Sequence, residues 1–204
     1  MAFGHPVRNT APRSACATSG LRGIDNLDRV FNGAGTWRGK IMRPMKEIDA
    51  LRRHVVDLLV GRNAHVDLEG ALKGMPVKLR GVKPKGSPHT AWQLLEHIRI
   101  AQWDILEFSR NPKHVSPPWP EGYWPKTEAP PSAAAWNKSV RQIRADLEAM
   151  QKLVASKKSD LFRPIPHGDG QTLLREALLV ADHNAYHVGQ LVLLRRLLDA
   201  WPAR

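Results

Sequence analysis

Apolar residues recur at intervals of three and four positions in four long stretches of the chain, and this spacing is that of one face of an α-helix. The stretches predict long helices over residues 45–61, 90–111, 132–157 and 172–200, with a shorter helical segment over residues 64–73. No stretch shows the alternation of apolar and polar residues that is typical of a strand, and the sequence contains no internal repeat. The pattern therefore predicts an all-α protein.

The segment between the second and third long helices, residues 112–131, contains seven prolines. That density excludes a regular helix or a central strand. Trp119, Tyr123 and Trp124 lie among the prolines, and the sequence leaves open whether they wall a pocket or simply pack against the helices. Four long helices with one long connecting loop predict an antiparallel four-helix bundle, which we expect to span residues 45–204.

Residues 1–44 show no sustained hydrophobic period and are rich in Gly, Ala, Ser, Thr and Arg. Seven basic and two acidic residues give this stretch a charge of +5. We expect either a disordered tail or a spurious N-terminal extension of the reading frame, with translation beginning at Met42 or Met45. The stretch lacks the apolar core of a secretory signal, so the expected location of the protein is the cytoplasm.

Composition narrows the class of protein further. A hydrophobic content of 42% is enough for a buried core, and no apolar run approaches the roughly 20 residues that a membrane span needs. The single cysteine, Cys16, excludes internal disulfides and CxxC metal motifs. The net charge of +12 permits anionic partners. However, the basic residues are dispersed among acidic ones, and no nucleic-acid-binding signature is present, so we expect neither nucleic acid nor membrane as a partner.

The last predicted helix carries two histidines at its apolar face. His187 falls on the stripe formed by Leu173, Ala177, Val180, Leu191, Leu194 and Leu198, and His183 lies beside it. Residues four apart on a helix share a face, with their Cβ atoms about 5–6 Å apart. The spacing therefore allows both imidazoles to aim at one metal ion. Asn184 follows the first histidine where metalloproteases have a glutamate, so the pair is not a zincin motif.

The helix predicted over residues 90–111 shows the same feature, because His97 lies between Leu94 and Ala101 on its apolar stripe. Burying an imidazole without a partner costs free energy, so each core-facing histidine needs a ligand or a hydrogen bond. One divalent cation would satisfy all three, and three neutral imidazoles with a fourth position open form a catalytic type of metal site. We therefore predict metal ligation by His97, His183 and His187; the alternative is that each is a separately satisfied core residue.

The two segments that carry these histidines also resemble a known family. They read LLEHIRIAQWDILEF over residues 94–108 and DHNAYHVGQLVLLRRLL over residues 182–198, which is similar to the DinB-like metal-binding four-helix bundles. That superfamily includes bacterial S-transferases that use bacillithiol or mycothiol. The resemblance covers roughly residues 45–200 and implies that one histidine of the second long helix and an HxxxH pair of the last bind the metal. Those roles fall on His97, His183 and His187.

The resemblance also implies a divalent ion (zinc, nickel or manganese), a low-molecular-weight thiol as cosubstrate, and a homodimer. Our leading hypothesis is a metal-dependent enzyme that acts on a small molecule, as a thiol S-transferase or a hydrolase, by activating a thiol or water. The alternative is a non-catalytic metal-binding bundle with a structural or interaction role. No carboxylate is placed as a general base.

The sequence also suggests roles for several other polar residues. Asn184 and Gln190 lie within one turn of the paired histidines, where they could either hydrogen-bond an imidazole or face the core or solvent. We expect Asp104 to form an ion pair with another helix, and His114 to lie at the surface of the proline-rich loop.

Overall fold

The computed structural model describes residues 46–61 and 64–202. Within these ranges the secondary structure is entirely helical, apart from one isolated bridge between Pro164 and Thr172. The long helices are α1 (Glu47–Val60), α3 (Ala91–Arg110), α4 (Ala133–Ala155) and α5 (Leu173–Leu197); the short ones are α2 (Leu68–Leu72) and the 3₁₀ turns η1 (Val77–Leu79) and η2 (Glu121–Tyr123). The all-α prediction is confirmed. The predicted tail, residues 1–44, lies outside the described residues, so the domain boundary stays a prediction.

Local capping explains why the long helices begin and end close to their predicted limits. Thr90 and Gln93 form a capping box at the start of α3, in which each side chain bonds the other residue's backbone N–H. Thr172 accepts a hydrogen bond from the backbone N–H of Arg175 and so caps α5. At the end of α1, Gly61 adopts the left-handed conformation, with φ 75°, that stops a helix.

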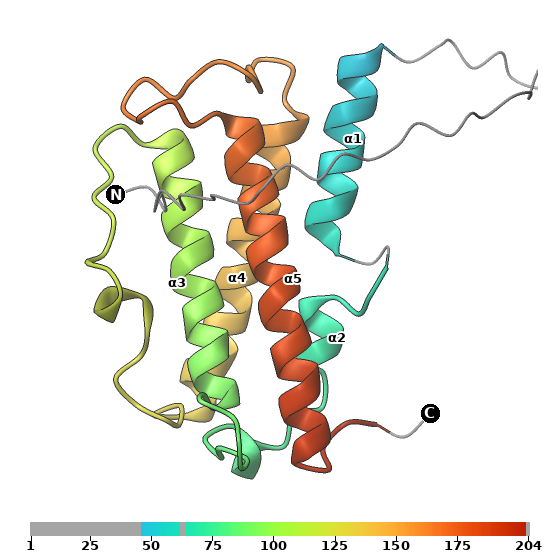
Figure 1. Cartoon of the computed structure of the whole chain (residues 1–204), viewed down its shortest axis with the longest axis vertical. Helices are drawn as coiled ribbons and strands as arrows, with labels where there is room; N and C mark the ends of the chain where they lie inside the picture. Colours follow the sequence, from blue (N-terminus) through green and yellow to red (C-terminus); the bar gives the residue numbers. More distant parts are fainter. Residues whose placement is uncertain (1–45, 62–63, 203–204) are drawn as a thin grey trace, which may run out of the picture. The chain divides into compact units, whose positions relative to one another are not determined.

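The four long helices form a bundle in which α1 and α5 run in one direction and α3 and α4 in the other (Figure 1). Trp92, near the start of α3, packs against Trp136, near the start of α4, with ring centroids 6.4 Å apart. These two helices are parallel because the proline-rich loop returns the chain along the length of the bundle before α4 begins (Figure 1). The predicted four-helix bundle is confirmed, and α5 is antiparallel to both α3 and α4.

The apolar core consists of two clusters stacked along the bundle. One cluster includes Val188, Leu191 and Leu194 of α5, and the other includes Leu173, Ala177, Val180 and Ala181 of the same helix. Burial of a leucine or isoleucine side chain contributes about 1.5–3 kcal/mol, so these clusters supply most of the favourable free energy of folding. Between them, α5 presents a polar layer that includes His183, Asn184 and His187. The candidate site lies in this layer.

None of the helices in the described ranges has the length and apolar composition that a membrane span requires.

Candidate metal centre

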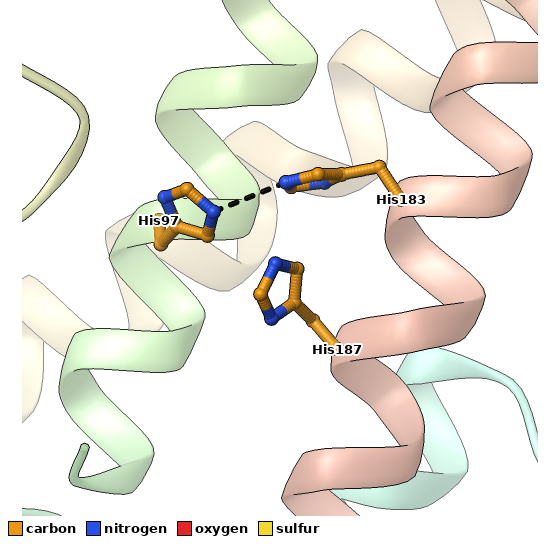
Figure 2. Close-up of side chains that lie close together, drawn as sticks. All are labelled: His97, His183 and His187. Carbon is orange, nitrogen blue, oxygen red and sulfur yellow. Dashed lines mark hydrogen bonds between the residues drawn. The ribbon is translucent and has the colours of Figure 1, made fainter. Parts of the chain in front are cut away.

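Three histidines from two antiparallel helices meet in the polar layer of the bundle. His97 lies in the first half of α3, and His183 and His187 lie on successive turns of α5, with all three rings pointing toward one another (Figure 2). One ring nitrogen of each lies within 4.8 Å of the other two. The Nε2 atoms of His97 and His183 are 3.1 Å apart. The structure therefore brings together the three residues that the sequence singles out.

The arrangement of ring nitrogens fits a single transition-metal ion. A zinc–nitrogen bond of about 2.0–2.1 Å in tetrahedral geometry places two ligand nitrogens about 3.3 Å apart, close to the observed 3.1 Å. Zinc and nickel accept imidazole ligands readily, whereas manganese favours oxygen. Among the residues that the structure describes, no carboxylate belongs to the cluster. The donor set therefore consists of three imidazole nitrogens.

Oxygen atoms behind two of the rings determine which nitrogen faces the centre. Nδ1 of His97 lies 3.0 Å from the backbone carbonyl of Tyr123, and Nδ1 of His187 lies 2.8 Å from Oε1 of Gln190. Because an oxygen accepts, Nδ1 carries the proton in each neutral ring, and the Nε2 lone pair is left for a ligand. Gln190 thus hydrogen-bonds an imidazole, which is one of the two roles that the sequence left open.

Burial keeps the three imidazoles uncharged. Only 5% of His97 and 6% of His187 is exposed. Desolvation lowers the pKa of His97 to about 4 and that of His183 to about 3, and it also lowers the pKa of His187. The proximity of the other imidazoles lowers the pKa of His97 and of His183 further. At neutral pH all three rings are therefore neutral, which is the state that a metal ligand requires.

The proline-rich loop covers His97. The indole of Trp124 stacks flat on its imidazole, with ring centroids 4.0 Å apart and an angle of 2° between the planes. His89 in turn stacks on Trp124, also at 4.0 Å. Tyr123 and Trp124 therefore belong to the wall of the site, while Trp119 contacts Tyr123 edge-on and is 57% exposed. His89 is not among the residues predicted to lie near the site, although its position immediately before the N-cap of α3 places it about two turns from His97.

Two of the sequence-based expectations are wrong, and the path of the same loop explains both. His114 is not at the surface: its side chain is only 6% exposed, and its Nε2 lies 2.7 Å from Oδ1 of Asp104. Asp104 pairs with this loop histidine rather than with another helix, and its second oxygen accepts a hydrogen bond of 2.6 Å from the hydroxyl of Tyr123. The loop folds back along α3, so its polar groups find partners there.

The sequence model of the DinB superfamily matches residues 62–191, which is more than half of the chain and includes all three histidines. No curated protein and no solved structure matches the chain. The all-helical fold and the family match agree, and together with the histidine cluster they allow a metal-binding role. The chain belongs to the DinB superfamily.

Proposed function

We propose that the protein is a divalent-metal-dependent enzyme that acts on a small molecule, and that His97, His183 and His187 hold the ion. The observation that carries this proposal is the convergence of three neutral imidazoles, two of them buried and that of His183 partly buried, with one ring nitrogen of each within 4.8 Å of the others. Withdrawing three clustered imidazoles from water costs free energy unless a shared ligand satisfies their nitrogens.

With three protein ligands and an open position, a bound divalent ion lowers the pKa of a thiol or water and supplies a nucleophile near neutral pH. The chain's own residues prepare the site for this chemistry. The Tyr123 carbonyl and Gln190 orient two of the rings, and Trp124 shields one face of His97 from water. Transfer of a low-molecular-weight thiol to an electrophile is favoured by the family resemblance, and hydrolysis is equally compatible with three histidine ligands.

The alternative function is a non-catalytic metal-binding bundle. It is favoured by the near-complete burial of His97 and His187 on two different helices, because an ion held there would tie α3 to α5. The two functions differ in whether the ion has an exchangeable position. With cobalt in place of the native metal, a small thiol added to the enzyme should produce a thiolate-to-cobalt charge-transfer band. A purely structural site should leave the cobalt spectrum unchanged.

The proposal is tested first by elemental analysis of protein purified without an affinity tag, beside a His97/His183/His187 triple-alanine variant. We expect about one equivalent of metal in the parent and none in the variant, as for a three-histidine site. Circular dichroism checks that the variant keeps its helices. Equal metal content in the two proteins, or none in either, would contradict the assignment of the ligands.

We further propose a cytoplasmic homodimer formed by residues 45–204, with no nucleic acid as partner. The dimer follows from the family resemblance, and α5 has large apolar side chains on its surface that would suit such a contact: Leu178, Tyr186, Leu193 and Leu197. Light scattering coupled to size-exclusion chromatography measures the mass directly. A monomer at all concentrations would contradict this part of the proposal.

A further inference from the structure

Helix α5 carries large apolar side chains on its outer side as well as on the side that faces the core. Those exposed on the outer side are Leu178, Tyr186, Leu193 and Leu197. By contrast, α3 and α4, which are of similar length, expose no large apolar side chain. Exposed apolar residues that gather on one helix face mark a contact surface more often than those scattered singly. The outer side of α5 is therefore a candidate interface.

Five exposed residues form a single stripe along this outer side. Spacings of four and three residues, which keep side chains on one face of a helix, separate Asp182, Tyr186, Gly189, Leu193 and Arg196. Gly189 lies in the middle, and a Cβ added there would have open space around it. The stripe thus has an acidic end, a basic end and a flat middle, with one large apolar side chain between the middle and each end.

The two charged ends have no ion-pair partner within the chain. Among the residues that the structure describes, neither Asp182 nor Arg196 belongs to a salt bridge. The guanidinium of Arg196 lies over the ring of Trp201, 6.0 Å from its centroid, and that contact leaves its charge unpaired. Both charges are therefore available to a partner outside the chain.

Two copies of the stripe are complementary when they run in opposite directions. A two-fold axis at Gly189 brings together residues that lie equally far on either side of it. Asp182, seven residues before the axis, then faces Arg196 of the second copy, seven residues after it. In a parallel pair each charge would face its own counterpart, and like charges opposite each other are costly. The missing side chain at Gly189 lets the two helices approach closely at the axis.

We propose that α5 packs against α5 of a second copy in antiparallel orientation about Gly189, with Asp182 of each copy paired to Arg196 of the other. This inference rests on the proposed function, because it assigns a surface and a register to the homodimer. The charge complementarity of the stripe with itself is the observation that selects a second copy as the occupant of this face.

The same pairing adjoins the candidate metal centre. The exposed ring of Tyr186 lies edge-on to the imidazole of His187, with ring centroids 4.9 Å apart. A second copy packed on the stripe covers the ring of Tyr186 and so removes solvent from that side of His187. Each copy's metal centre then lies beside the interface, because His187 is two residues from the axis.

Exchange of the two charges tests the register. Asp182→Arg alone and Arg196→Asp alone each place like charges opposite each other at both ends of the interface, so we expect either to raise the dimer dissociation constant about tenfold or more. The double variant Asp182→Arg/Arg196→Asp restores opposite charges and should dimerise like the parent. Arg141→Asp, at an exposed position of α4, is the matched control and should have no effect. Sedimentation velocity over a series of concentrations measures the dissociation constants.

A cysteine at the axis tests the position of Gly189. A residue on a two-fold axis meets its own counterpart, and a disulfide forms where the two Cα atoms lie about 4.4–6.8 Å apart. Gly189→Cys in a Cys16→Ser background should therefore become a covalent dimer under mild oxidation. Arg141→Cys in the same background should not.

The outcomes separate this inference from the rest of the proposed function. A dimeric parent whose two single charge variants dimerise equally well would overturn the α5 register and leave the homodimer standing. A parent that is monomeric at every concentration would show that something other than a second copy covers this face, and would overturn both. Metal content is measured separately on Arg196→Asp, whose substitution lies more than two helical turns from His187. One equivalent of metal in that variant keeps the ligand assignment independent of the dimer.

Discussion

The imidazole of His97 is held by the loop on two sides, through a hydrogen bond to the Tyr123 carbonyl and through the stacked indole of Trp124. Contacts of these two kinds fix both the tilt and the rotation of the ring. A ligand whose geometry is set before binding loses less conformational entropy when the ion binds. At the scale of the residue, the site is therefore organised by groups outside the three histidines themselves.

Protonation of the histidines should make the stability of the metal-free protein depend on pH. The folded-state pKa values, about 4 for His97 and about 3 for His183, lie below the unfolded value near 6.5. Between these values and pH 6.5, the unfolded state thus binds more protons than the folded state. The free energy of unfolding is therefore highest above about pH 6.5 and falls as the pH falls toward 4. Urea unfolding of metal-free protein at a series of pH values measures how the free energy of unfolding changes with pH.

The His97/His183/His187 triple-alanine variant is the control for this pH dependence of the free energy of unfolding. Because it lacks all three imidazoles, we expect its stability to change less between pH 7 and pH 4 than that of the parent. The same slope in both proteins would show that other groups, chiefly carboxylates, dominate the pH dependence.

A single substitution separates ligation from folding. We expect His183→Ala to abolish tight metal binding while the bundle stays folded, because two ligands bind a divalent ion far less well than three. His65→Ala is the matched control: His65 is exposed, and its ring contacts the carbonyl of Val66 outside the cluster. Isothermal titration with zinc gives both affinities. Retained one-to-one binding in His183→Ala would contradict the role of this residue.

At the same scale, helical spacing alone was enough to select the three clustered histidines. His97 and His187 occupy apolar stripes and His183 lies beside one, and a polar residue at such a position must have a partner in the core. His89 and His114 escaped this reasoning because they lie outside long helices, where no periodicity shows which way a side chain points. His89 stacks on Trp124, which is distant in the sequence, and the contact of His114 with Asp104 depends on how the loop folds.

The proline-rich loop is the element that links the fold to the site. It places Tyr123 so that the backbone carbonyl faces His97 while the hydroxyl donates to Asp104, seven residues further along α3. Desolvation and the neighbouring Asp104 raise the pKa of the Tyr123 hydroxyl, so it remains a donor at all ordinary pH values. The loop is thereby anchored at a buried, charged acceptor.

Removing the Tyr123 hydroxyl should loosen this anchor. Tyr123→Phe leaves one oxygen of the buried Asp104 without its donor, and hydrogen bonds to charged groups contribute about 1.5–3 kcal/mol. We expect the free energy of unfolding in urea to fall by that amount. Tyr186→Phe is the matched control, because Tyr186 is 65% exposed and its loss of a hydroxyl should leave stability unchanged. Equal effects of the two substitutions would show that the anchor contributes nothing.

At the scale of the element, the sequence located the long helices closely but not the path of the loop. Capping residues such as Thr90 and Thr172 accept hydrogen bonds from backbone N–H groups three residues on, so the helix starts can be predicted from the local sequence. Proline density excludes regular structure in residues 112–131 without indicating where the chain goes. The parallel arrangement of α3 and α4 follows from that path, and the 64–73 segment shortens to α2, which begins after the N-cap Asp67.

At the scale of the molecule, the candidate ligands belong to α3 and α5, which lie side by side in opposite directions (Figure 1). Both helices contribute residues to each of the two apolar clusters, and these clusters lie on either side of the polar layer. An ion bound by both helices would therefore cross-link the centre of the bundle. Such binding must stabilise the folded chain, because the unfolded chain does not hold the three histidines together.

The size of this stabilisation can be predicted from linkage. A ligand at a free concentration of 100 times its Kd stabilises the folded state by about 2.7 kcal/mol. For a domain of this size, that raises the midpoint of thermal unfolding by about 5–10 °C. Differential scanning calorimetry with buffered zinc, before and after a chelator, measures the shift, and the triple-alanine variant should show none. An equal shift in the variant would mean that zinc stabilises the chain elsewhere, and a shift absent from both would show that the three histidines do not hold zinc in the folded bundle.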